Sequence, residues 1–271
     1  MNHYWNLSYL ATKLRQEMIL VTNDDGIVAP GIKALVEVAR EFGNVVVVAP
    51  DSPQSGKGHA ITLSNPLKIR KVEMFDGVTA YECNGTPVDC VKIAKNVLLK
   101  DQSISLCLSG INHGSNASIN IIYSGTMSAA MEASIEGIPS IGFSLCDYSF
   151  DADFSASKVY ARKIIADILL SPMQDCKLLN VNIPALPTSE IKGIKVCKQG
   201  AGTWVEEFQE GLDPRGVPYY WLTGKFQSFE NDEVDNDINA LKNGYVSVVP
   251  SMHDLTHYGE MSKFKLLESK I

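Results

Sequence analysis

The chain of 271 residues lacks the features of several large classes of protein. No apolar run approaches the ~20 residues that cross a bilayer, and residues 1–17 lack the continuous apolar core of a signal peptide. Basic residues are outnumbered, with 24 Lys and Arg against 31 Asp and Glu, for a formal net charge of −7. This balance argues against nucleic-acid polymers and membranes as partners, although a bound metal would still allow a small anionic substrate.

Closely spaced cysteine pairs are also lacking. The six cysteines include no Cys-x-x-Cys motif, and three of them, Cys107, Cys146 and Cys197, lie within apolar runs. Free, buried thiols in a reducing compartment are the expectation. Together with the missing signal and membrane segments, this predicts a cytoplasmic protein.

The distribution of apolar residues predicts an α/β fold with a mostly parallel sheet. Apolar runs typical of strands buried on both faces occur at 19–22, 45–49, 104–108, 140–144 and 178–183. Helical patterns lie between them, from about residue 31, after residue 86, after residue 124 and over 155–170. Shorter strand-like pieces occur at 61–63, 67–69 and 78–81.

The composition changes beyond about residue 198, where aromatic and charged residues alternate. This pattern predicts a twisted β-hairpin arm, followed by a short helix that ends at Gly244 and a return strand over 245–249. We therefore divide the chain into an N-terminal extension (1–17), a core (18–198), and a segment of the same domain (199–271) that holds the arm, the return strand and the C-terminal segment.

The first apolar run stops at Asn23-Asp24-Asp25-Gly26, which is typical of a tight, exposed turn at the carboxyl end of a strand. In an open α/β sheet, ligands bind at that edge. Adjacent carboxylates repel each other, so a divalent cation between them is the favoured interpretation. The alternative is that Asp24 and Asp25 merely end the strand and cap the turn.

Two further polar loops, 52–59 and 109–116, follow other predicted strands. The carboxyl ends of parallel strands share one edge, so the three loops can converge. Their oxygen-rich side chains suit Mg²⁺ or Mn²⁺ rather than Zn²⁺. The predicted helix start at Ser124-Gly125-Thr126 adds backbone N–H groups and a positive dipole end, which favours an anion. A hard cation beside an anion site indicates phosphate-ester hydrolysis.

Other residues in these stretches have simpler interpretations. Ser55 and Asn112 are common loop formers, and His59 and His113 can be structural, solvent-facing or catalytic. Thr86-Pro87-x-Asp89 is typical of a helix cap. The aromatic residues from Trp204 onward favour packing or an interface over a base-stacking platform.

From about residue 18 to about residue 250, the sequence resembles the SurE survival-protein family of nucleotidases. The matching blocks are Asn23-Asp24-Asp25-Gly26, Pro50-Asp51 with Ser55-Gly56, Gly85-Thr86-Pro87-x-Asp89, Ser109-Gly110-Ile111-Asn112-x-Gly114-x-Asn116 and Ser124-Gly125-Thr126. The resemblance implies a three-layer α/β/α, Rossmann-like core and a divalent-metal-dependent 5′-nucleotidase that releases phosphate from nucleoside monophosphates. It also implies a homodimer or homotetramer built by the protruding hairpin and the C-terminal segment.

The resemblance further implies roles for single residues. One divalent cation per subunit, Mg²⁺ or Mn²⁺, would be held by Asp24, Asp25, Ser55 and Asn112. Asp24, Asp25 and Asn112 would be catalytic, and Asn116, Ser124, Gly125 and Thr126 would bind the substrate phosphate. Many family members carry an Arg where this chain has Ser52, and Lys57 is the candidate replacement for that charge.

Several alternatives stay open at this stage. Asp24 could attack phosphorus directly or orient a water molecule, and either His59 or His113 could protonate the leaving alkoxide. The chain could also be a phosphatase of other small phosphoesters or polyphosphate, or a non-catalytic nucleotide or metal sensor. Base, sugar and 5′ versus 3′ preference are not decided.

Overall fold

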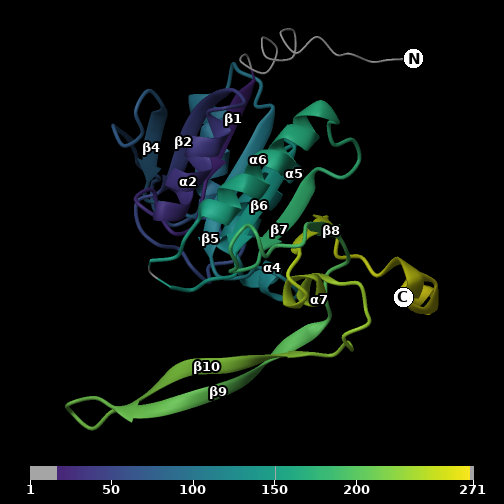
Figure 1. The fold of residues 1–271 in the computed structure, drawn as a ribbon. Coiled ribbons are helices and arrows are strands. Elements are labelled where there is room, and N and C mark those ends of the chain that lie inside the picture. Colours follow the sequence, from purple (N-terminus) through teal and green to yellow (C-terminus); the bar gives the residue numbers. More distant parts are fainter. Residues whose placement is uncertain (1–16, 150, 269–271) are drawn as a thin grey trace, which may run out of the picture.

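The computed structural model describes residues 17–149 and 151–268, apart from the side chains of residues 206 and 207. The predicted N-terminal extension lies outside these ranges except for Glu17. Figure 1 shows a central sheet flanked by helices, from which a long two-stranded hairpin projects. No helix in the described residues is both long enough and apolar enough to traverse a bilayer.

The central sheet has nine strands in the order β3-β4-β2-β1-β5-β6-β7-β11-β8. Their bounds are β1 (Met18–Thr22), β2 (Asn44–Pro50), β3 (Ile69–Val72), β4 (Thr79–Cys83), β5 (Leu106–His113), β6 (Ser140–Leu145), β7 (Leu178–Ile183), β8 (Ile194–Val196) and β11 (Val246–Ser251). Only the β3–β4 and β7–β11 pairs are antiparallel, so the prediction of a mostly parallel sheet is confirmed.

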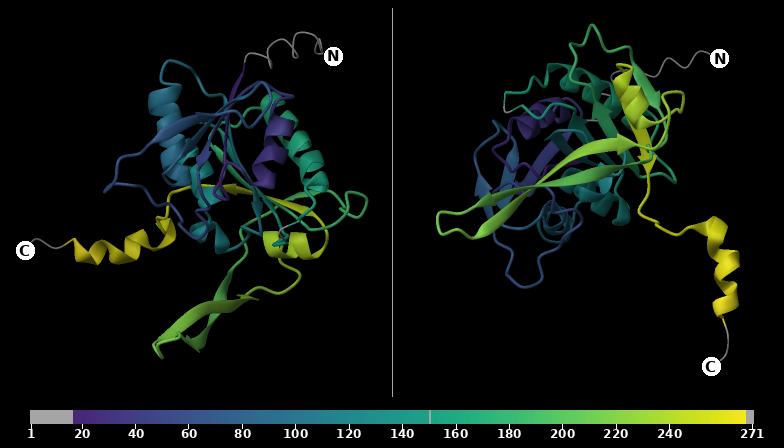
Figure 2. Two further views of the ribbon diagram at one scale, coloured as in Figure 1. Left: turned by 90° about the vertical axis from the view of Figure 1, so that its left-hand side faces the viewer. Right: turned by 90° about the horizontal axis from the view of Figure 1, so that it is seen from below.

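Helices cover both faces of this sheet. Helices α2 (Pro30–Ala39) and α6 (Ser155–Leu170) lie on one face. Helix α3 (Pro87–Ile93), its π-helical continuation η1 (Ala94–Leu98), and α5 (Gly125–Ile135) lie on the other face. The three layers are visible in the two views of Figure 2, which confirms the α/β/α architecture.

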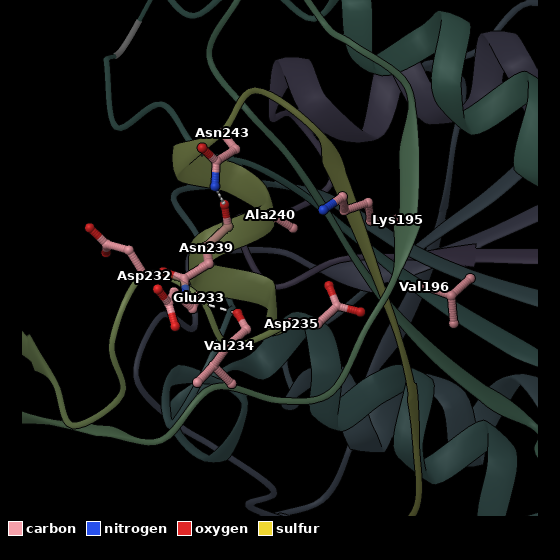
Figure 3. A pocket seen from close by; sticks show the side chains of 9 residues that line it. All are labelled: Lys195, Val196, Asp232, Glu233, Val234, Asp235, Asn239, Ala240 and Asn243. Atoms are coloured by element: carbon pink, nitrogen blue, oxygen red, sulfur yellow. Dashed lines mark hydrogen bonds between the residues drawn. The ribbon is translucent and has the colours of Figure 1, made fainter.

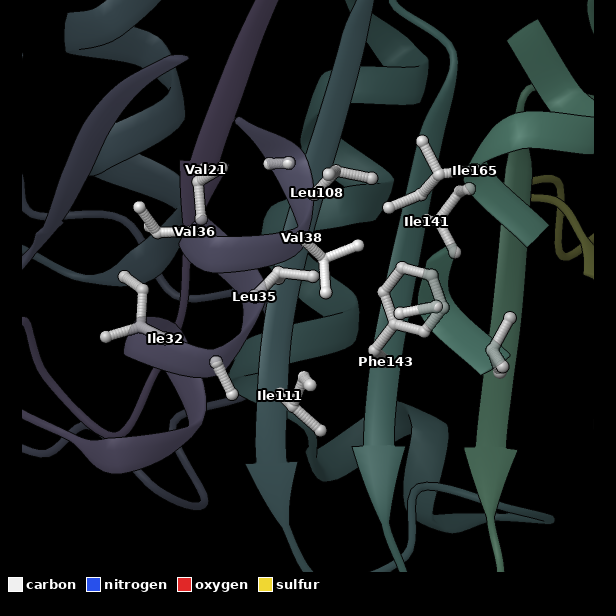
Figure 4. Close-up of a cluster of buried hydrophobic side chains, with 14 of the residues drawn as sticks. Val21, Ile32, Leu35, Val36, Val38, Leu108, Ile111, Ile141, Phe143 and Ile165 are labelled. Carbon is white, nitrogen blue, oxygen red and sulfur yellow. The ribbon is translucent and has the colours of Figure 1, made fainter. Parts of the chain in front are cut away.

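The strands are apolar throughout because both faces are covered. In β1, Ile19 and Val21 belong to the core under α2 and α6, whereas Leu20 belongs to the core under α3 and α5. Figure 4 shows the first of these cores, where Leu35 of α2 and Phe143 of β6 lie in one cluster of buried side chains. The continuous apolar runs of the sequence are the direct result of this double burial.

The predicted helix caps are present. At the start of α3, Thr86 Oγ1 accepts from Asp89 N–H (3.1 Å) while Asp89 Oδ2 accepts from Thr86 N–H (2.9 Å), which completes a capping box. At the start of α5, Ser124 Oγ accepts from Met127 N–H (3.0 Å). All three hydrogen bonds satisfy N–H groups that have no partner within the helix.

The residues beyond 198 form the predicted arm and return strand. Strands β9 (Gly202–Leu212) and β10 (Pro218–Ser228) pair as an antiparallel hairpin that stands clear of the body. Helix α7 (Asp237–Lys242) follows, and β11 returns to the main sheet. The C-terminal segment contains η2 (Tyr258–Glu260), α8 (Met261–Phe264) and η3 (Lys265–Leu267), and it also extends away from the body (Figure 2).

Three local predictions are wrong. Residues 61–63 are not a strand, because Thr62 N–H donates to the Asp89 carboxylate (3.1 Å) rather than to a neighbouring strand. The strand predicted at 67–69 lies instead at Ile69–Val72, where it pairs with β4. The loop predicted from Ser109 begins later, because β5 continues to His113.

Candidate functional site

The predicted site residues gather where the strand order reverses. Strand β1 has β2 on one side and β5 on the other, and this reversal opens a crevice at the carboxyl ends of the strands. A hollow of about 190 Å³ lies there. Five of the predicted site residues line it: Asp24, Ser55, Asn112, Asn116 and Ser124. The three loops therefore converge as their positions in the sequence predicted.

Asp24 is buried rather than exposed, which corrects the predicted open turn. Its side chain and backbone are only 3% exposed, because the start of α5 packs directly against it. A Cβ atom at Gly125 would lie 2.6 Å from Asp24 Cβ and 2.9 Å from Asp24 Oδ2. Thr126 Oγ1 donates a hydrogen bond to Asp24 Oδ1. Gly125 and Thr126 thus position Asp24 and do not themselves line the hollow.

Burial changes the chemistry of Asp24. Burial and the neighbouring charge of Asp25 raise its pKa from 3.8 to about 6, against the opposing effect of the hydrogen bond from Thr126. Among the described residues, no lysine or arginine forms an ion pair with either carboxylate. A divalent cation would supply the missing positive charge, so this carboxylate pair fits a metal.

Asn112 is aimed at the hollow by a β-bulge. The register between β5 and β6 shifts between Ser109 and Asn112, at Gly110 with φ of +124°. A Cβ at Gly110 would lie 2.3 Å from the Phe143 carbonyl oxygen, so only glycine fits there. The Asn112 side chain donates through Nδ2 to the Gly114 carbonyl (2.9 Å). Its Oδ1 accepts no hydrogen bond within the described part of the chain and is free to act as a ligand.

Unpaired polar atoms also lie at the ends of these strands. Among described residues, the buried side-chain atoms without a hydrogen-bond partner include Thr22 Oγ1, Asn23 Oδ1 and Ser109 Oγ. Thr22 and Ser109 face each other across the β1–β5 pairing. Buried polar atoms are normally paired, so these three indicate water or an ion at this edge of the sheet.

Asn116 belongs to an asparagine network that the sequence analysis missed. Its Nδ2 donates to Ser144 Oγ (2.8 Å), and its backbone N–H donates to Asn182 Oδ1 (2.8 Å). Asn180 Nδ2 in turn donates to the Asn116 carbonyl (2.9 Å). The available signal was the pair of asparagines two residues apart in the otherwise apolar strand β7, since that spacing places both on one face.

The two candidate histidines occupy different places. His113 lines the hollow, and its Nδ1 lies 3.5 Å from Asp25 Oδ2. His59 does not line the hollow, and its Nε2 lies 2.8 Å from Glu132 Oε2. Burial alone would raise the pKa of Glu132, but the hydrogen bonds from Lys92 and His59 hold it below its usual value. His59 thus belongs to a cluster with Lys92 of α3 and Glu132 of α5.

Lys57, the candidate replacement for the family arginine, lines a second hollow of about 430 Å³ with Gln54 and Lys68. The same loop separates the two hollows, because Ser55 and Gly56 line the first one. Lys57 is therefore beside the site rather than in it.

A third hollow, of about 310 Å³, lies between the acidic loop before α7 and strand β8. Figure 3 shows the carboxylates of Asp232, Glu233 and Asp235 there, opposite Lys195. Asp232 is paired with Lys242 (2.8 Å). Across the described ranges, no three His, Cys, Asp or Glu side chains are placed to share a metal ion.

Comparisons with known proteins show the family of this chain. A model of the family described as "Survival protein SurE" matches residues 19–206. The chain is 56% identical over 244 residues to the 5′-nucleotidase SurE of Christiangramia forsetii, covering 89% of this chain and 93% of that protein. It is 53% identical over 243 residues to the 5′-nucleotidase SurE of Cytophaga hutchinsonii, covering 90% and 93%.

A solved structure is also similar. The crystal structure of the SurE protein from Aquifex aeolicus superimposes with a TM-score of 0.81 at 42% identity, and the match covers 93% of this chain and 100% of that one. The residues matched by the family model, 19–206, include every residue that lines the sheet-edge hollow. The chain therefore belongs to the SurE survival-protein family.

Proposed function

We propose that this protein is a divalent-metal-dependent 5′-nucleotidase, which hydrolyses nucleoside 5′-monophosphates to nucleoside and inorganic phosphate. The observation that carries the proposal is the buried Asp24 carboxylate, which lies beside Asp25 without a cationic partner in the described structure. The relatives that carry the name 5′-nucleotidase SurE support the same reaction.

Four residues would hold one Mg²⁺ or Mn²⁺ ion. Asp24 and Asp25 offer carboxylates, Ser55 offers an exposed hydroxyl, and Asn112 offers its free Oδ1. Ligands that are all oxygen suit these hard cations. When bound, the cation supplies positive charge that polarises the phosphoryl oxygens.

The substrate phosphate would enter at the start of α5. Thr126 directs both its hydroxyl and its backbone N–H to Asp24, so it acts as a positioning residue. Ser124 lines the hollow with Asn116, and the N–H of Gly125 has no acceptor in the described part of the chain. These groups and the helix dipole favour an anion.

His113 is the proposed general acid. It lines the hollow, whereas His59 is held by Glu132. The carboxylate of Asp25, 3.5 Å from His113 Nδ1, would orient the ring toward the hollow.

The test is a phosphate-release assay on a panel of nucleoside monophosphates, small phosphoesters and polyphosphate, with Mn²⁺ and Mg²⁺ in parallel and with a chelator. We expect metal-dependent release that is fastest with nucleoside 5′-monophosphates. Equal release from all small esters would instead indicate a broad phosphatase, and nucleotide binding without release would indicate a sensor.

We also propose that the protein is a homodimer or homotetramer joined by its hairpin and C-terminal segment. Large apolar side chains are exposed on both, including Trp221 and Leu222 on the hairpin and Leu255 and Phe264 near the C-terminus. Exposed apolar surface of this extent is typical of an interface. Sedimentation equilibrium tests this proposal, because a monomer at micromolar concentration would contradict it.

We further propose a cytoplasmic location, which the free cysteines of the described chain support.

A further inference from the structure

The rim of the sheet-edge hollow is aromatic, whereas its floor is polar. Tyr123, Tyr148 and Trp204 line it together with the predicted ligands Asp24 and Asn112. These aromatic residues come from three separate places: the end of α4 (Asn120–Tyr123), the loop after β6, and the base of strand β9. The polar residues suffice for a cation and a phosphate, so the proposed phosphoryl chemistry leaves the three rings without a role.

Trp204 is held in place by two contacts. Its Nε1 donates to Asn120 Oδ1 (2.7 Å), and its ring meets Phe226 edge-on at 6.1 Å between centroids. With its polar atom already paired, the indole offers the hollow an apolar face. The sequence analysis favoured packing or an interface for this tryptophan, and the structure places it at the wall of the site.

The two tyrosines are exposed at the rim. Tyr148 is 73% exposed, although its ring lies so close to Gly114 that a Cβ there would be 2.2 Å from Tyr148 Cε1. Tyr123 is 53% exposed and directly precedes Ser124, the predicted phosphate ligand. Exposed rings at the mouth of a polar hollow, one of them fitted against a glycine, offer flat surfaces to a ligand.

We propose that Tyr123, Tyr148 and Trp204 form a stacking platform for the base of the nucleotide, so that they select nucleotides over phosphate esters that lack a base. This inference rests on the proposed function and extends it to the specificity of the site. A nucleoside monophosphate has a dianionic end and an aromatic end, which match the polar floor and the aromatic rim.

The size of the hollow agrees with this division. Its volume of about 190 Å³ is below the roughly 300–1,000 Å³ of pockets that enclose a drug-sized ligand. The phosphate thus occupies the floor and the base lies on the rim. Stacking uses the π-face that every base has, so it tolerates all bases. Purine bases have a larger ring system than pyrimidines, so they gain more from stacking.

The experiment compares AMP with ribose 5-phosphate, which carries the same phosphate and sugar without the base. The measured quantity is kcat/KM for each compound in the full chain with Mn²⁺. The variants are Tyr148→Ala and Trp204→Ala, with Tyr148→Phe and Trp204→Phe as conservative versions. Phe229→Ala is the matched control, because Phe229 is 67% exposed near the base of the hairpin but does not line the hollow.

We expect each alanine variant to lower kcat/KM for AMP by about tenfold, equivalent to about 1.4 kcal/mol of lost stacking. The value for ribose 5-phosphate should stay within about twofold, and the phenylalanine variants should retain most of the preference for AMP. Phe229→Ala should leave the ratio between the two substrates unchanged. A thermal melt identifies any variant that is misfolded. If Trp204→Ala is misfolded, the Tyr148 variants alone test the proposal, because Tyr148 is 73% exposed.

Two results overturn the platform while the proposed function stands: a parallel fall for both substrates, or no change for AMP in Tyr148→Ala and Trp204→Ala. If the unchanged protein hydrolyses AMP and ribose 5-phosphate equally well, the platform is also wrong. If it releases phosphate from neither compound, the proposed function fails, and the platform fails with it.

Discussion

Thr126 donates its hydroxyl hydrogen to the carboxylate of Asp24, and this bond ties the first turn of α5 to the carboxyl end of β1. The two residues are 102 positions apart in the chain. The bond therefore joins the predicted metal ligand to the helix start that is predicted to receive phosphate. Four variants test the consequences of this arrangement.

Replacing Thr126 with valine should raise the pKa of Asp24 above its value of about 6, because the hydrogen bond from Thr126 lowers it. Asp24 must be deprotonated to bind a cation, so the acidic limb of the pH–rate profile should move to higher pH. Activity near neutral pH should fall roughly tenfold, as is usual when a residue that orients a ligand is removed. Thr126→Ser keeps the hydroxyl and should restore the original profile; a valine variant with an unshifted limb contradicts the assignment.

Replacing Gly125 with alanine should displace Asp24, since the added Cβ would lie 2.6 Å from Asp24 Cβ. A displacement of this kind costs about 100-fold in activity even where the ligand itself is retained. Manganese affinity, measured by titration calorimetry, should fall in parallel. Ser134→Ala, near the other end of the same helix, is the control. Normal manganese binding by Gly125→Ala would show that α5 does not position Asp24.

Replacing His113 with alanine should slow the hydrolysis of AMP by about 100-fold, the usual contribution of a general acid. p-Nitrophenyl phosphate should be affected much less, because its leaving group departs without a proton. His59→Ala serves as the comparison, since His59 contacts Glu132 rather than the hollow. Equal losses on both substrates would remove His113 from the role of general acid.

Asp24 should also destabilise the metal-free protein at neutral pH. Its pKa is raised in the folded state from 3.8 to about 6, so its favourable contribution to the free energy of unfolding is complete below 3.8 and is lost as the pH rises through about 6. Without metal, Asp24→Asn should therefore be more stable than the unchanged protein at about pH 8, by up to roughly 3 kcal/mol. The difference should shrink at acid pH.

Urea unfolding of both proteins with EDTA, at acid and neutral pH, measures this difference. Added Mn²⁺ should reverse the order at neutral pH, because a ligand that binds only the folded state stabilises it. If Asp24→Asn is the less stable protein at neutral pH in EDTA, the unpartnered carboxylate is not a source of strain.

The layers of the fold could be predicted because the sequence expresses them locally. Val45 to Ala49 form a continuous apolar run since helices cover both faces of β2, and Thr86 with Asp89 form a cap within a single turn. The irregular course of residues 61–63 could not be predicted, because Thr62 pairs with Asp89, 27 positions away.

The convergence of the polar loops at one edge of the sheet could be predicted, but the detailed geometry there could not. Polar residues after apolar runs indicated the edge where they meet. The burial of Asp24 depends on Gly125, which packs against it from the start of helix α5. The position of Trp204 depends on how the hairpin leaves the body, and its bond to Asn120 spans 84 positions. Alternation of aromatic and charged residues carries no information about such a contact.

The most direct test of the central claim is manganese binding, followed by calorimetry or by electron paramagnetic resonance, in the full chain and in Asp24→Asn. The account predicts one Mn²⁺ per chain in the unchanged protein, loss of that binding in Asp24→Asn, and a fall of about 1,000-fold in phosphate release from AMP. Unaltered manganese binding and turnover in a folded Asp24→Asn protein would contradict it.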